Sequence, residues 1–223
     1  VAVPGNATGT LISNFGGLPS AFDPLKTFML GGRTELELTT LLKPTFVSLW
    51  IGNNDVLGAF ISTTNAGDTT QITPVGTFNT QYDSVAAVIG SFNPRGVVLI
   101  SVANVTSIPF ASPAAIYYCL KNGGCPPPLP PQNPILAAIP TFTVNVNCAP
   151  PGGLNILVPW VIGLRRVDSA AAGVPKTIDC TDAPSVISPA ETQAMLTAIA
   201  GYNAKIAQTA TDHGWAYWDV NPA

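Results

Sequence analysis

Charged residues are scarce in this sequence, and their scarcity excludes whole classes of protein. Only 9% of the 223 residues are charged, against about a quarter in an average globular domain. The 9 Lys and Arg residues face 12 Asp and Glu residues, which gives a formal net charge of -3. No basic face is available to neutralise phosphates, so we expect no nucleic-acid partner.

Histidine and long apolar runs are also lacking. His213 is the single histidine, and the four cysteines do not have zinc-finger spacing, so we expect neither a metal site nor a cofactor. No apolar run is long enough to span a bilayer, and the first residues do not resemble a signal peptide. No serine lies in a Gly-x-Ser-x-Gly motif.

Apolar residues, prolines and cysteines are plentiful. Hydrophobic residues make up 47% of the chain, with 22 Pro and 20 Gly, which indicates a globular body with long ordered loops. Cys119 and Cys125 close a short loop, and Cys148 and Cys180 bracket a longer one. An even number of cysteines in loop-rich sequence favours two disulfides, and thus a secreted, periplasmic or cell-surface protein. Four reduced, buried thiols are the alternative.

Three apolar, β-branched stretches predict strands buried on both faces, near 45–51, 96–102 and 215–220. Amphipathic stretches between them predict helices near 77–92 and 188–212. The second helix would begin in a capping box and end at a glycine. Alternation of buried strands with helices indicates an α/β fold, a three-layer α/β/α sandwich around a parallel sheet.

The region from about 107 to 187 interrupts this pattern. Its "GGCPPPLPPQNP" segment is proline-rich and predicts extended chain. A disulfide-tied insertion within a single domain, residues 1–223, is the simplest interpretation. A lid or a partner-binding loop is the alternative.

The stretch "SLWIGNNDVLG" ends its predicted strand in a cluster of polar residues. Amides and carboxylates are costly to bury without partners, and ligands bind at the carboxyl ends of the strands in open parallel sheets. Asn54 and Asp55 lie at such an end, as does Asn221. His213 joins a helix to the start of a strand, so we expect it at the opposite edge, in a structural role.

"VAVPGNATGTL" followed by "WIGNNDV" resembles blocks II and III of the SGNH (GDSL-type) hydrolases. "LISVANVTSIPF" and "SPAETQAMLTAIAGYNAKIAQTATDHGWAYWDVN" are similar to later parts of the same family. The resemblance implies a flavodoxin-like α/β/α sandwich that hydrolyses esters with a serine nucleophile.

The resemblance also implies roles for particular residues. The backbone N–H of Gly5 and the side-chain amide of Asn54 would form an oxyanion hole. Gly52 would let the chain turn sharply out of its strand, and Asp55 would hold the loop.

Two family motifs are missing. Gly-Asp-Ser would precede "VAVPG", and no Asp-x-x-His follows "WDVN". We therefore expect the chain to be the middle portion of an esterase or lipase. The first strand, the serine and the histidine would then belong to other segments or to a partner chain that completes the sheet.

Whether this chain is itself an enzyme stays open. An exported, non-catalytic structural or binding subunit is the main alternative, and a carbohydrate O-acetyl esterase would share the same residues. In the enzyme readings the partner is a small-molecule or lipid ester.

Overall fold

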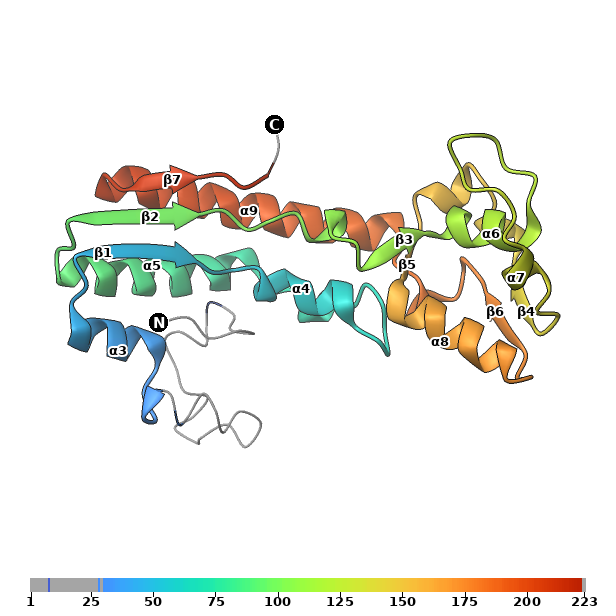
Figure 1. Ribbon diagram of the computed structural model, residues 1–223. Helices are drawn as coiled ribbons and strands as arrows, with labels where there is room; N and C mark the ends of the chain where they lie inside the picture. The colour runs from blue at the N-terminus through green and yellow to red at the C-terminus, as the bar shows by residue number, and fades with distance from the viewer. Residues whose placement is uncertain (1–7, 9–27, 29, 222–223) are drawn as a thin grey trace. The chain divides into compact units, whose positions relative to one another are not determined.

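The computed structural model describes residue 8, residue 28 and residues 30–221 (Figure 1). The chain divides into two compact units. The first comprises residues up to 57, 72–104 and those from 197 onward, and the second comprises 58–71 and 105–196. The sequence predicted one domain with an insertion at about 107–187, and all of that insertion lies in the second unit.

The first unit contains the predicted parallel sheet. Its strands are β1 (Phe46–Trp50), β2 (Gly96–Ile100) and β7 (Ala216–Trp218), in the order β1-β2-β7. All five residues of β1 pair in parallel with those of β2. The mixed α/β architecture and the parallel direction of these strands confirm those two parts of the sequence prediction.

Two long helices lie along this sheet (Figure 1). They are α5 (Val75–Ser91) and α9 (Pro189–His213), close to the predicted bounds. In α5 the apolar stripe is buried, and its members are Phe78, Tyr82, Val85, Ala86 and Ile89.

The predicted ends of α9 are also present. The Ser188 backbone N–H donates to Glu191 Oε2 at 2.7 Å, and the Glu191 N–H donates to Ser188 Oγ at 3.3 Å, which completes the capping box. Gly214 follows the helix with a φ of +65°, a conformation that glycine adopts without steric cost.

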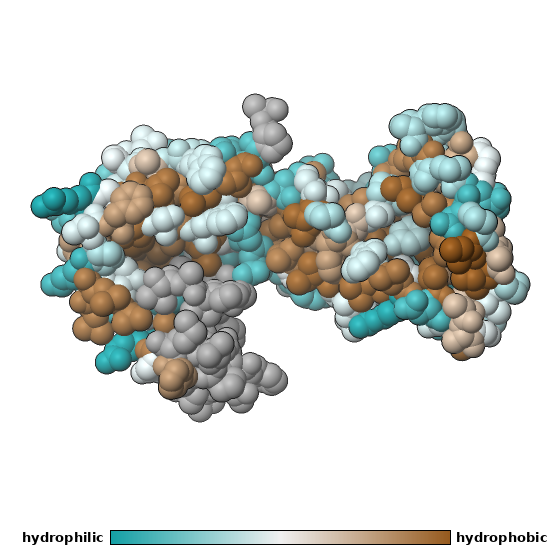
Figure 2. Space-filling model, in the orientation of Figure 1, coloured by the Kyte–Doolittle hydropathy of each residue, from teal (hydrophilic) through white to brown (hydrophobic). Residues whose placement is uncertain are grey.

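The prediction that the strands are buried on both faces is wrong for β1 and β7, whereas β2 between them has no exposed residue. Phe46, Trp50 and Trp218 are 63%, 58% and 60% exposed, and burial alternates along β1. Hydrophobic residues reach the surface over this part of the molecule (Figure 2). The reason is that α5 and α9 cover one face, while no helix of the described residues buries the aromatic side chains of the other.

Helices also form where the sequence predicted none. The polar cluster after β1 opens α4 (Asn54–Ile61), and α3 (Glu35–Leu42) precedes β1. The α3 helix has its own capping box, in which Thr34 and Glu37 exchange hydrogen bonds of 2.7 and 3.1 Å.

The second unit is more regular than the predicted insertion. Its strands form two small sheets, β3 with β5 antiparallel and β4 with β6 parallel. The elements are β3 (Ala111–Pro113), α6 (Ala114–Asn122), α7 (Pro134–Ala137), β4 (Phe142–Val144), β5 (Leu157–Pro159), α8 (Trp160–Ala171) and β6 (Lys176–Ile178). Short 3₁₀ turns connect several of them, at Thr69–Gln71, Val105–Ser107, Val146–Cys148, Gly152–Leu154 and Ala183–Ser185.

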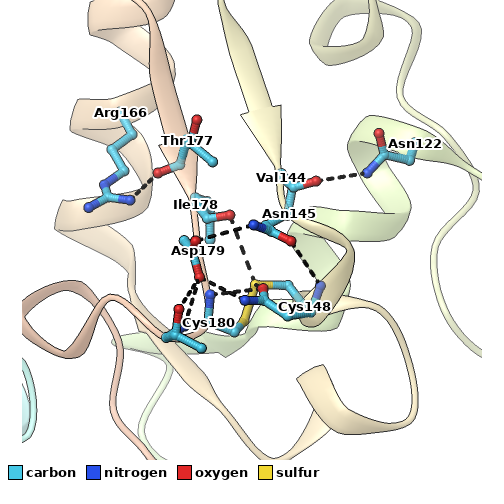
Figure 3. The surroundings of a disulfide bond; sticks show 11 residues. Asn122, Val144, Asn145, Cys148, Arg166, Thr177, Ile178, Asp179 and Cys180 are labelled. Carbon is cyan, nitrogen blue, oxygen red and sulfur yellow. Dashed lines mark hydrogen bonds between the residues drawn. A yellow bond between two sulfur atoms is a disulfide. The ribbon is translucent and has the colours of Figure 1, made fainter.

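Both predicted disulfides are present in this unit. Cys119 bonds to Cys125 and Cys148 bonds to Cys180. The second bridge joins the segment after β4 to the segment after β6 (Figure 3). Cys148 is fully buried in an apolar cluster whose buried members all belong to the second unit, so this unit has its own core.

Candidate functional site

The carboxyl end of β1 turns sharply at Gly52. Its φ is +111°, and a Cβ built there would lie 2.6 Å from Val102 Cγ2 and 3.0 Å from the Phe78 ring. The Asp55 N–H donates to the Gly52 carbonyl at 3.1 Å. The glycine therefore lets the chain leave the strand and enter α4 within a few residues, which brings the polar side chains to the edge of the sheet.

Asn53 joins the ends of two neighbouring strands. Its backbone carbonyl accepts from the Leu57 N–H at 2.8 Å, which starts the helix. Its side-chain Oδ1 accepts from the backbone N–H of Ala103, beyond β2, at 3.0 Å. Sequence reasoning assigned no role to Asn53, because a side chain that binds backbone across the sheet leaves no local signal.

Of the two predicted oxyanion donors, the structure describes only Asn54. Asn54 is the first residue of α4 and is half-buried at the carboxyl edge. Gly5 lies outside the described residues. The predicted convergence of the Gly5 N–H and the Asn54 amide therefore stays a prediction.

Asp55 is buried and binds Thr8, near the start of the chain. Its Oδ2 accepts from the backbone N–H of Thr8 at 2.8 Å and from the Thr8 hydroxyl at 2.9 Å. Thr8 itself is fully buried. The other carboxylate oxygen, Oδ1, is buried and accepts no hydrogen bond from the described residues. Asp55 thus ties residue 8 to the end of β1, and no sequence pattern indicates this partner.

The segment after β2 is held by asparagines from distant parts of the chain. Asn203, on α9, accepts from the Val102 N–H at 2.7 Å and donates to the Val102 carbonyl at 3.0 Å. Asn221 donates to the same carbonyl at 3.0 Å and accepts from the Asn104 N–H at 2.7 Å. Side chains therefore satisfy backbone groups that no strand pairs.

Ser101 completes this network. It is fully buried, its hydroxyl donates to Asp219 Oδ1 at 2.8 Å, and it accepts from the Val220 N–H at 2.9 Å. Hydrogen bonds from the Asn221 backbone and from Ser101 hold the pKa of Asp219 below its usual range. A buried hydroxyl fixed between such partners is a structural element rather than a nucleophile.

His213 lies at the other end of the sheet. It is the last residue of α9, stacks on Trp215 with ring centroids 4.2 Å apart, and precedes the start of β7. No nucleophile–base pair forms at the carboxyl edge among the described residues. The described residues also contain no group of three or more His, Cys, Asp or Glu side chains that could hold a metal ion.

A second polar cluster lies beside the Cys148–Cys180 bridge in the second unit (Figure 3). Asp179 accepts from Asn147 Nδ2 at 2.7 Å, from the Thr181 N–H at 2.9 Å and from Asn145 Nδ2 at 3.2 Å. Led by the bond from Asn147, these lower the pKa of Asp179 to about 2. The cluster therefore holds the loop after β6.

This cluster predicts a pH dependence. The pKa of Asp179 is depressed in the folded state, so its stabilising bonds are complete above about pH 4 and are lost as the pH falls toward 2. We expect Asn147→Ala to raise that pKa toward the ordinary aspartate value of 3.8, measured by carboxyl ¹³C NMR titration. Asn122→Ala is the matched control, because Asn122 binds the Val144 carbonyl instead. An equal shift in both variants would contradict the assignment.

Comparisons with known proteins do not assign this site. No family model, no curated protein and no solved structure matches the chain. Among the described residues, no helix has the length and apolar character needed to cross a bilayer. The candidate site is therefore defined by its own geometry: a glycine turn, Asn54, and the two hydrogen bonds that Thr8 donates to Asp55 at the carboxyl edge of a parallel sheet.

Proposed function

We propose that this chain supplies the oxyanion-binding part of an exported serine esterase or lipase of the SGNH type. The observation that carries the proposal is the pair of hydrogen bonds from Thr8 to Asp55. They join the first of the two resembling motifs to the second at one edge of the sheet. Thr8 follows Gly5 by three residues, which span at most about 11 Å of extended chain, so covalent geometry allows Gly5 to approach Asn54.

The chemistry assigned to the chain is electrostatic. In acyl transfer, a serine attacks the ester carbonyl and a histidine takes its proton, then returns it to the leaving alcohol. Both groups would lie outside these residues. The Gly5 N–H and the Asn54 amide would donate to the oxyanion of the tetrahedral intermediate, where such a donor lowers the barrier by roughly 3 kcal/mol.

The proposal includes the third layer of the sandwich. Parallel sheets occur almost only with both faces covered, and Phe46, Trp50 and Trp218 are the most exposed aromatic side chains of this sheet. A helical layer contributed by further polypeptide would bury them. The same face also favours the alternative function, a non-catalytic subunit whose sheet packs against a partner chain. The two disulfides support an oxidising, exported location for either.

Ester hydrolysis tests the proposal. The 223 residues alone should not hydrolyse p-nitrophenyl butyrate above background, because oxyanion donors without a nucleophile retain only part of the catalysis. The product of the complete reading frame should hydrolyse it and lose activity to a serine-reactive phosphonate. In that protein, Asn54→Ala should lower kcat by at least ~10²-fold.

Asn155→Ala, an exposed asparagine of the second unit, is the control and should retain full activity. Phosphonate-sensitive turnover by the 223 residues alone would contradict the proposal that the serine and the histidine lie outside them. An inactive complete protein would leave the partner-binding subunit as the function.

A further inference from the structure

The second unit contains an open pocket of about 780 Å³. Its walls come from the end of α6, from the proline-rich segment that follows, and from the segment after Cys148. The lining residues include Tyr118, Leu129, Pro150, Pro151 and Leu154, together with the Pro126–Pro128 run. All belong to one compact unit.

The walls of this pocket are fixed in place. The Cys119–Cys125 bridge closes the loop before the prolines, and Cys148, bonded to Cys180, immediately precedes the opposite wall. Within that wall, a Cβ on Gly153 would lie 2.0 Å from the Cys148 carbonyl oxygen, so the two segments pack backbone to backbone. A cavity with such walls is preformed and does not depend on a ligand to order it.

The chemistry of the lining is uniform. None of its side chains is charged, and the Tyr118 hydroxyl is the only hydrogen-bonding side-chain group among them, because Cys125 is in a disulfide. Five prolines and two leucines make up seven of the other eleven lining residues. Small-molecule sites have this composition, apolar walls with very few polar groups, and volumes of about 300–1,000 Å³.

We propose that this pocket binds an uncharged, apolar small molecule, such as one that carries an aryl or acyl group. An extended peptide added as a strand is a poorer fit, because that mode needs backbone N–H donors along the wall and proline has none. A charged ligand would lose its hydration in this pocket, and no lining side chain could compensate for that loss. The site lies in the second unit and does not depend on the proposed ester hydrolysis.

Binding of N-phenyl-1-naphthylamine, an uncharged aryl probe, tests the site. Titration of the ¹⁵N-labelled chain should give saturable shifts at the non-proline amides of the lining, among them Gly123, Gly124, Leu129 and Leu154. Leu154→Asp should weaken binding at least ~10-fold, the effect of losing one buried leucine contact. Leu154 is 41% exposed, so the variant should fold, and its amide spectrum verifies that.

Ile135→Asp is the matched control, because Ile135 is 74% exposed and lies outside the lining. It should bind the probe as the parent chain does. Shifts confined to the exposed sheet residues Phe46, Trp50 and Trp218, a non-saturable titration, or equal weakening by both aspartates would overturn the proposal. Tighter binding of an apolar peptide or of a second copy of the chain at these amides would also overturn it.

Discussion

Replacing Gly52 by alanine should destabilise the first unit by about 4 kcal/mol. Two costs add: a non-glycine residue held at positive φ costs ~1–3 kcal/mol, and forcing a methyl group into packed surroundings costs ~1–3 kcal/mol. At Gly52 the φ is +111° and the new Cβ would meet Val102 and Phe78 at 2.6 and 3.0 Å. Guanidinium unfolding followed by tryptophan fluorescence measures the loss, since Trp50, Trp215 and Trp218 all belong to this unit.

Gly214→Ala separates the two costs. Gly214 also has a positive φ, +65°, but a Cβ there would meet no atom within 4 Å. We expect it to cost only about 1 kcal/mol. Equal losses of unfolding free energy in the two variants would mean that the close contacts around Gly52 add nothing to the cost of its substitution.

Removing the Cys148–Cys180 bridge should destabilise the second unit more than removing the other bridge. In the chain-entropy relation, a separation of 32 residues corresponds to about 3.7 kcal/mol, and one of 6 residues to about 2.2 kcal/mol. Paired Cys→Ala substitutions remove each bridge without leaving a free thiol. Hydrogen exchange of the β4 and β6 amides reports the local free energy of opening in this unit.

The order of the two losses is the informative result. Cys148 and Cys180 link the segments that follow β4 and β6, whose strands pair in parallel and need a long connection. Cys119 and Cys125 close only the end of α6. A larger effect from the shorter loop would show that the proline-rich segment, rather than the paired strands, limits the stability of this unit.

Long, strongly periodic segments were predictable from the sequence. The strands at 46–50 and 96–100 have continuous apolar runs, and α9 has both an apolar stripe and a capping box. The α8 helix was missed because Pro159 and Gly163 interrupt its apolar run and suggest a loop. In the structure Pro159 is the residue before the helix, and Gly163 is buried where a Cβ would meet the Tyr117 ring. Proline is well tolerated at a helix start, and glycine at a close contact.

The candidate site was predictable only in outline. The polar residues after β1 indicated a special edge, but α4 was missed because Asn54 was interpreted as an oxyanion donor and Asp55 as a residue that holds a loop. They are equally suited to the positive end of a helix. The partners Thr8, Asn203 and Asn221 bind backbone or side chains across tens of residues, and no local pattern in a single sequence encodes such contacts.

The asparagine contacts at the end of β2 have a consequence for how the chain folds. Val102 and Asn104 find their partners 101 and 117 residues further along the chain. Contacts of such separation form late, because a long loop must first close at an entropic cost before these hydrogen bonds can stabilise the chain. On a ribosome, β1, β2 and α5 emerge well before Asn203 and Asn221. The edge that carries Asn54 can therefore reach its final geometry only when synthesis of these 223 residues is almost complete.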